Sequence, residues 1–285
     1  MDPETPEHLL SFTKMNGLGN DYVYVDAFKH PFLLTMNLPH LSIMLSNRNF
    51  GIGSDGLILI CPPSTVESGP PSPPDFKMRM FNADGSEGEM CGNGIRCAVK
   101  FAVDRGIVGR RESPVQVETG NGVLEVRFKM DEMGKVGLIS VDMGVPKLAC
   151  KDIPAVDIQG IEKDQAVISH PIDLNCFGPQ DWHIKAGVQP FMTLVSMGNP
   201  HVVFTCTGDL KDIPLSVIGP LIEHHYWFPS RINVHFVKFK PFNLDDEMSY
   251  CEMRTWERGS GETLACGTGA CSVAVAGVLL GQVEY

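Results

Sequence analysis

The sequence reads Met78-Arg79-Met80-Phe81-Asn82 and, thirteen residues after Met78, Cys91-Gly92-Asn93-Gly94. The same arrangement occurs again, as Met253-Arg254-Thr255-Trp256-Glu257 followed at the same distance by Cys266-Gly267-Thr268-Gly269. The copies are offset by 175 residues, and each carries Gly-Ser and an acidic residue between its ends. Internal self-similarity of this kind indicates a repeated structural unit.

A second pair of motifs supports this duplication. Gly19-Asn20 precedes an apolar stretch at residues 22–25, and Gly198-Asn199 precedes another at 202–204, at an offset of 179 residues. Chance recurrence of Gly-rich turns in an α/β protein is the alternative. Because both offsets nearly agree, we predict an N-terminal half at residues 1–143 and a C-terminal half at 144–285.

Each half is predicted to be mixed α/β (α+β), with a sheet wrapped round a central helix and the active site in the cleft between the halves. The helices should follow the two Cys-Gly motifs, at about 92–105 and 268–280, each ending before a glycine. The second helix is apolar on all sides, which predicts burial. Further strands are expected at 115–118, 123–128 and 136–141, further helices near 38–47 and 215–224, and a proline-rich surface loop at 62–74.

Composition narrows the class of protein. The net charge of −11 argues against a nucleic-acid partner, because such proteins carry basic patches. No stretch approaches the roughly 20 apolar residues that span a bilayer, so no membrane is expected. The nine cysteines include no Cys-x-x-Cys pair, which favours a reducing compartment over disulfides or a zinc ribbon. We therefore expect a cytoplasmic protein without a metal.

Cys91 and Cys266 each stand where a Gly-rich loop enters a helix. The first amides of a helix carry partial positive charge, so we expect them to lower the thiol pKa toward about 7. One cysteine could then be ionised while the other is protonated, as a base and its mirror-image acid require. The bare amides at Gly92 and Gly267 could hold a carboxylate. Packing is the alternative reading of any free cysteine, and we expect it for the remaining seven.

At these residues the chain resembles the diaminopimelate epimerases. The stretch from Asn82-Ala83-Asp84-Gly85-Ser86 to Cys97 is similar to the first family signature, and Glu257-Arg258-Gly259-Ser260-Gly261 through Cys271 to the second. Two further blocks, at residues 14–21 and 196–201, are also similar. The resemblance runs from about residue 11 to the end of the sequence.

The resemblance implies interconversion of LL- and meso-diaminopimelate in lysine biosynthesis, with no cofactor. It implies Cys91 and Cys266 as the two bases, with His201 and Glu257 near the reacting centre. The residues implied in substrate binding are Asn20, Asn82, Gly92, Asn93, Asn199, Asn233, Arg258, Gly267 and Thr268. A homodimer is left open.

Some positions depart from the family pattern. Gly56 stands where some members have Gln, and Ser260 replaces a common Ala. The first half continues after its helix through residues 106–143, whereas the second stops within five residues of its own. We therefore expect the second half to be truncated, as a fragment or as a naturally short protein. The alternatives for function are a two-cysteine racemase of the proline-racemase type, a phenazine-type isomerase, and an inactive homologue.

Overall fold

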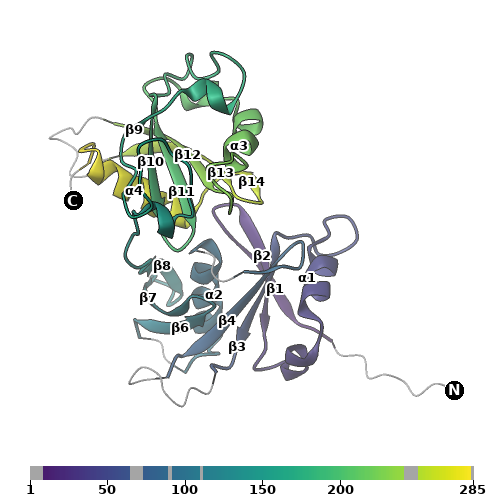
Figure 1. Cartoon of the computed structure of the whole chain (residues 1–285). Helices are drawn as coiled ribbons and strands as arrows, with labels where there is room; N and C mark the ends of the chain where they lie inside the picture. The colour runs from purple at the N-terminus through teal and green to yellow at the C-terminus, as the bar shows by residue number, and fades with distance from the viewer. Residues whose placement is uncertain (1–8, 65–72, 89–91, 110–111, 241–249, 284–285) are drawn as a thin grey trace. The chain divides into compact units, whose positions relative to one another are not determined.

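The structure is a computed structural model that describes residues 9–64, 73–88, 92–109, 112–240 and 250–283. Two compact units divide the chain, Met1–Asp142 and Met143–Tyr285, and each is described by itself (Figure 1). Cys91 and residues 65–72 of the proline-rich segment lie outside the described residues. Among the described residues, no helix is long and apolar enough to cross a membrane.

Unit 1 contains an eight-stranded sheet in the order β1-β2-β3-β4-β6-β7-β8, with β5 paired to β4. Its strands are β1 (Phe12–Gly17), β2 (Asn20–Asp26), β3 (Gly56–Cys61), β4 (Phe76–Asn82), β5 (Glu87–Gly88), β6 (Val115–Thr119), β7 (Gly122–Met130) and β8 (Val136–Val141). The helix α2 (Gly92–Asp104) contacts both β1 and β8, the two edges, so the sheet curls round it. The opposite face is covered by α1 (Leu38–Ser46).

Unit 2 contains a six-stranded sheet in the order β14-β13-β12-β11-β10-β9. Its strands are β9 (His170–Pro171), β10 (Phe191–Ser196), β11 (Pro200–Thr205), β12 (Asn233–Phe239), β13 (Cys251–Glu257) and β14 (Gly261–Thr263). The helix α4 (Gly267–Leu279) packs on β10, β11 and β12, and α3 (Leu215–Glu223) contacts β12, β13 and β14.

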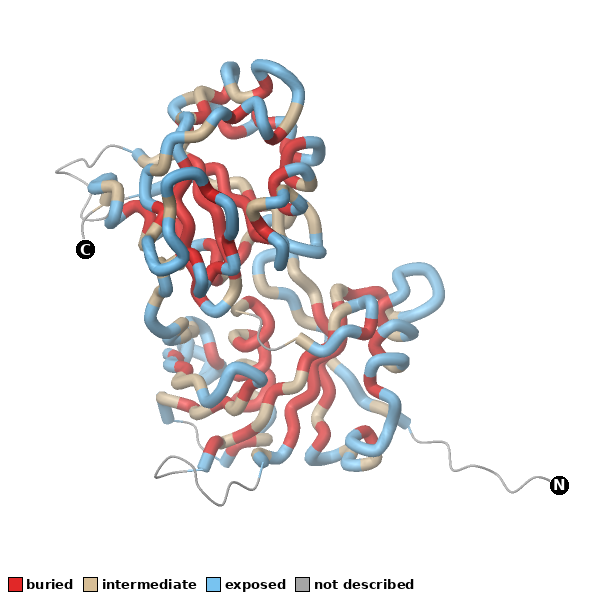
Figure 2. The backbone as a smooth tube through the Cα atoms, viewed as in Figure 1, coloured by how far each residue is buried: buried red, intermediate tan, exposed pale blue. Residues whose placement is uncertain are grey.

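Burial follows the alternation of side chains along the strands. In β3, Ile58 and Ile60 join the core on the α2 side, whereas Leu57 and Leu59 join the core on the α1 side. A strand covered on both faces must be apolar throughout, and β3 is. Figure 2 shows the buried strands of both units as continuous red segments. In unit 2, Val203 faces α4, and its neighbours Val202 and Phe204 belong to the core on the other face.

The strand pairing confirms the duplication. In both units the first four repeated strands pair antiparallel, parallel and antiparallel, as β1-β2-β3-β4 and as β10-β11-β12-β13. Met80 pairs with Gly88 and Thr255 with Thr263, so the register reproduces the 175-residue offset. The predicted fold class, two related mixed α/β units with curled sheets, is confirmed.

The helix boundaries agree with the sequence to within one residue, but the burial of α4 does not. Gly106 and Gly281 follow the helices with φ of 66° and 64°, the left-handed conformation that ends a helix at glycine. Ala270, Ala274, Val278 and Leu279 are exposed, so the expectation that α4 is buried on all sides is wrong. In unit 1, β8 contacts the corresponding helix, and no strand follows α4 in the described part of unit 2.

Candidate active site

Cys266 caps the N-terminus of α4. Its backbone is extended, with φ −129° and ψ 117°, and its Sγ accepts the backbone N–H of Gly269 at 3.3 Å. The same sulfur lies 3.5 Å from Oγ1 of Thr268, the second residue of the helix. The side chain is only 5% exposed. The Cys-Gly-x-Gly sequence therefore places a buried sulfur against the first amides of the helix.

Burial, followed by the negative charge of Glu257, raises the pKa of the Cys266 thiol to about 12. Thr268 and the Gly269 amide act in the opposite direction, by hydrogen bonds to the sulfur. The expectation of a pKa near 7 is therefore wrong for Cys266, because desolvation outweighs the helix amides. This structure holds the sulfur as a thiol, which is the form that donates a proton.

Glu257 ends β13 beside this thiol. Oγ1 of Thr263 donates to its Oε1 at 2.6 Å, across the hairpin that joins β13 to β14. The thiol itself also donates a hydrogen bond to the Glu257 carboxylate, which further disfavours the thiolate. The negative charge of the Glu257 carboxylate therefore favours the protonated form of the Cys266 sulfur.

A buried carboxylate, Glu223 on α3, supports this hairpin from the other face of the sheet. It accepts hydrogen bonds from Nε1 of Trp256 at 2.7 Å and from the backbone N–H of Gly259 at 3.0 Å. Arg231 lies 3.5 Å from the same carboxylate. Glu223 therefore fixes the turn that follows Glu257, and nothing in the sequence pattern of α3 indicated this role.

The side chains of Asn233 and Arg258, both predicted to bind substrate, form hydrogen bonds within the protein. Nδ2 of Asn233 donates to the carbonyl of Pro200 at 2.8 Å, and its Oδ1 accepts the backbone N–H of Arg258 at 2.9 Å. Asn233 thus ties β11 to the turn after β13. The Arg258 side chain is exposed and donates to the carbonyl of Ser230 at 3.1 Å.

Two histidine rings stack on the α4 side of the sheet, and both are fully buried. Nδ1 of His201 lies 2.8 Å from Nε2 of His235, and Nε2 of His201 lies 2.8 Å from Oδ1 of Asn199. Burial lowers the pKa of His235 to about 3. Burial, followed by the charges of His235 and Arg258, also lowers the pKa of His201. Both rings are therefore neutral at physiological pH.

The neutral pair predicts sensitivity to acid. A histidine with a lowered folded-state pKa contributes stability that is fully present above about pH 6.5 and is lost as pH falls toward the folded value. Each ring contributes a slope of about 1.4 kcal/mol per pH unit in that range. Urea unfolding at pH 7 and pH 5 should show that His235→Gln loses less free energy of unfolding on acidification than the wild type. Equal losses in the two proteins would contradict this assignment.

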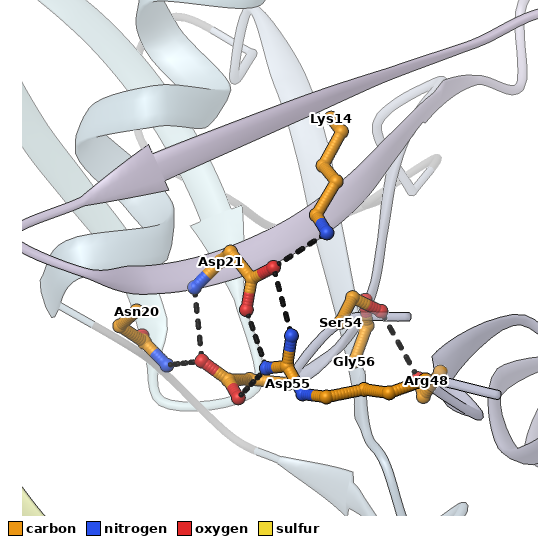
Figure 3. Close-up of polar contacts among 8 residues, drawn as sticks. Lys14, Asn20, Asp21, Arg48, Ser54, Asp55 and Gly56 are labelled. Atoms are coloured by element: carbon orange, nitrogen blue, oxygen red, sulfur yellow. Dashed lines mark hydrogen bonds and ion pairs between the residues drawn. The ribbon is translucent and has the colours of Figure 1, made fainter. Parts of the chain in front are cut away.

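In unit 1, Asp55 organises the residues around Asn20 (Figure 3). Its Oδ2 accepts Nδ2 of Asn20 at 2.8 Å and the backbone N–H of Asp21 at 2.9 Å. Its backbone carbonyl accepts the N–H of Ala83 at 3.0 Å, directly after Asn82. Asp55 therefore brings Asn20 and Asn82, which are far apart in sequence, to the same end of the sheet.

Asp21 is held by two cations. Arg48 lies 2.8 Å from Oδ1 and Lys14 2.8 Å from Oδ2, as Figure 3 shows. These interactions outweigh desolvation and lower the pKa of Asp21 to about 2. Arg48 also contacts Asp55 at 2.9 Å, so one guanidinium links both carboxylates. The start of β2, which carries Asn20, is thereby held in place.

Of the remaining predicted residues of unit 1, Asn82 ends β4, and Gly92 and Asn93 begin α2. Nδ2 of Asn82 donates to Oγ of Ser86 at 2.9 Å. Asn93 is buried, and its Oδ1 accepts Nη2 of Arg96 at 2.7 Å. Gly17 approaches Asn93 closely, since a Cβ there would lie 3.1 Å from the Asn93 carbonyl oxygen. Gly92 is the first residue of the helix.

Gly56 cannot carry a side chain in this backbone. A Cβ would overlap the carbonyl oxygen of Phe81 and lie 2.8 Å from the ring of Tyr22. A glutamine at this position would require a different path of β3 against β4. Its carbonyl instead accepts Oγ of Ser54 at 2.9 Å.

Sequence reasoning missed Asp55, Glu223 and His235. His235 alone had a local signal, because it lies two residues after Asn233 in a strand and so shares its face. The side chains of Asp55 and Glu223 form hydrogen bonds with residues 33 to 36 positions away in the sequence. No short sequence motif can indicate contacts over that separation. Among the described residues, no cluster of histidine, cysteine and acidic side chains could hold a metal ion.

Comparison with known proteins gives the same family over most of the chain. The sequence model of the family described as diaminopimelate epimerase matches residues 12–149 and 193–285. The diaminopimelate epimerase of Leptospira biflexa is 45% identical over 273 residues, covering 96% of this chain and 85% of that protein. That of Methanococcus maripaludis strain C5 is 45% identical over 274 residues, with 96% and 86% covered.

Solved structures share the fold at low sequence identity. A hydroxyproline epimerase from Agrobacterium vitis superposes with a TM-score of 0.54 at 13% identity, covering 96% of this chain and 78% of that one. A PhzF-family protein of Bacillus anthracis gives 0.52 at 16% identity, with 94% and 79% covered. At this identity the similarity shows the fold alone.

Proposed function

Because the chain belongs to the diaminopimelate epimerase family, a family of isomerases, we propose that it interconverts LL- and meso-diaminopimelate. One of the two cysteines, Cys91 or Cys266, removes the α-proton and the other delivers a proton to the opposite face, without pyridoxal phosphate or a metal. The observation that carries this proposal is the buried Cys266 thiol, which caps α4 beside Glu257 and Thr268. The repeated Cys-Gly-Asn-Gly at 91–94 supplies the second thiol.

The raised pKa of Cys266 gives it the role of the acid in the resting protein. To act as the base, it must lose its proton while the Gly269 N–H and the Thr268 hydroxyl stabilise the thiolate. A substrate ammonium group nearby would offset the negative charge of Glu257 and so lower the thiol pKa. Inversion requires removal of the proton on one face of the α-carbon and delivery on the other, which two cysteines satisfy.

The start of α4 also supplies the groups that would stabilise the carbanion. The first amides of a helix have no partner within it, so those of Gly267 and Thr268 can bind the α-carboxylate. Their partial positive charge favours the negative charge that develops on deprotonation. We assign Gly92 and Asn93 the equivalent role at α2. Asn20, Asn82, Asn199, Asn233 and Arg258 complete the proposed substrate contacts, with the exposed Arg258 guanidinium facing the distal carboxylate.

The test is turnover of LL-diaminopimelate by the reduced protein in D₂O. We expect meso product that carries one deuterium at the inverted carbon, while unreacted substrate stays protiated at early times. L-Proline serves as the rival substrate, and its racemisation with no turnover of diaminopimelate would favour a proline-racemase activity. No turnover of either compound would identify an inactive homologue and overturn the proposal.

We also propose a cytoplasmic location. The cysteines within the described residues are all free, as expected in a reducing compartment. Light scattering on the assayed sample would establish the oligomeric state, for which a homodimer is one expectation.

A further inference from the structure

We infer that His235 is a positioning residue for Cys266: it fixes the direction of a hydrogen-bond chain that ends at the sulfur. This inference rests on the proposed function. The chain runs from Oγ1 of Thr255 to Nδ1 of His235 at 3.0 Å, and from Nε2 of His235 to Nδ1 of His201 at 2.8 Å. It continues through Asn199 and Thr268 to Cys266.

The direction of the hydrogen-bond chain follows from the orientation of the Asn199 amide. Nδ2 of Asn199 donates to Oγ1 of Thr268 at 3.3 Å, so its Oδ1 must accept from Nε2 of His201. His201 is then unprotonated at Nδ1 and must receive the proton of His235 Nε2. His235 in turn accepts from the hydroxyl of Thr255. Each neutral ring has one proton, so with Asn199 in this orientation one arrangement satisfies every link.

This direction determines what Thr268 offers the sulfur. Because Oγ1 of Thr268 accepts from Asn199, its hydroxyl proton is directed elsewhere, and Sγ of Cys266 lies 3.5 Å away. The hydroxyl can donate to a thiolate and accept from a thiol. It can therefore serve the sulfur in both protonation states that the reaction requires.

Comparison of the two repeated units shows that the fold can form without this hydrogen-bond chain. The strand registers make Ile58 the counterpart of His235 and Met80 the counterpart of Thr255, since Ile58 pairs with Met80 as His235 pairs with Thr255. Unit 1 thus builds the same sheet with apolar side chains at these positions. At these two positions the polar side chains are particular to the unit that carries Cys266.

The packing of α4 places His235 directly beneath the cysteine. A Cβ on Gly269 would overlap Cε1 of His235 and lie 3.0 Å from both its Nε2 and Cβ of Cys266. The glycine therefore lets the first turn of the helix rest on the ring. A change at His235 reaches Cys266 both through this contact and through the chain.

The test compares His235→Gln with His235→Ile. Glutamine retains a donor for His201 Nδ1, whereas isoleucine, the residue at the equivalent position of unit 1, does not. We expect kcat within about threefold of wild type for the first, and a loss of about tenfold or more for the second, because a buried acceptor is left unpaired. Full kcat in His235→Ile would overturn the inference.

Two further measurements sharpen the test. Adding Thr268→Val to His235→Ile should cost less than the sum of the single effects, because both interrupt one chain; full additivity would overturn the inference. His225→Phe, which replaces a half-buried histidine in a separate aromatic cluster, is the matched control and should leave kcat unchanged.

The tautomers can be measured without any activity. Nitrogen NMR of the wild-type protein labelled at the histidine rings should show His201 and His235 both neutral and protonated at Nε2. Protonation of His201 at Nδ1 would reverse the chain and overturn the inference. If the tautomers are as expected but diaminopimelate is not turned over, the proposed function fails and the hydrogen-bond chain stands.

Discussion

Cys266→Ala is expected to lower kcat for epimerisation by about 10³-fold or more, since a positioned acid or base contributes 10²–10⁴-fold. The physical reason is that alanine removes the proposed acid itself. Of the groups bonded to the sulfur, Gly269 offers an amide, Thr268 an alcohol of far higher pKa, and the Glu257 carboxylate is held by the Thr263 hydroxyl. Chiral separation of the two epimers measures the loss. Circular dichroism should be unchanged, because alanine fills a capping position of similar size.

Proton exchange provides the stronger form of this test. The Cys266→Ala protein retains Cys91. In D₂O it should exchange the α-proton of one epimer for deuterium without inverting that carbon. Cys91→Ala should do the same to the other epimer. This complementary pattern follows only if each cysteine serves one face of the carbon. Exchange of the same epimer by both variants, or full-rate turnover by either, would end the two-base proposal.

Cys176→Ala is the matched control for these variants. Cys176 is exposed and lies in unit 2 outside the site, so its loss removes a thiol without touching the chemistry. Its kcat and its exchange pattern should equal those of the wild type.

Gly269→Ala is expected to damage both stability and activity. The new Cβ would overlap the buried ring of His235, which cannot yield because β12 and α4 hold it on both sides. Overpacking of this kind costs about 1–3 kcal/mol of unfolding free energy. A shift of about 1 Å at the start of α4 would misplace Cys266 and lower kcat by about 10²-fold. Urea unfolding and the epimerase assay measure the two effects separately.

Gly109→Ala is the control for this substitution. A Cβ at Gly109 meets no atom within 4 Å, so its replacement should change neither quantity. A Gly269→Ala protein with wild-type kcat would show that the ring and the helix start can separate without consequence. That result would also weaken the role assigned to His235.

Short-range signals allowed much of the fold to be predicted. The glycines at 106 and 281 end their helices because only the left-handed conformation closes the last turn there. The repeated Cys-Gly motif located both helix starts. These features depend on neighbours within a few residues, which is why the sequence reports them.

The sequence by itself determined that the chain is duplicated, where its central helices begin and end, and which thiols stand at their starts. The tertiary structure decided what Cys266 can do. The pKa of Cys266 is raised because burial removes water from the sulfur and β13 places Glu257 beside it. Asp55, Glu223 and His235 likewise act on groups brought near by folding. Charge, burial and hydrogen-bond direction depend on distances in space, and those distances exist only once the sheets have formed.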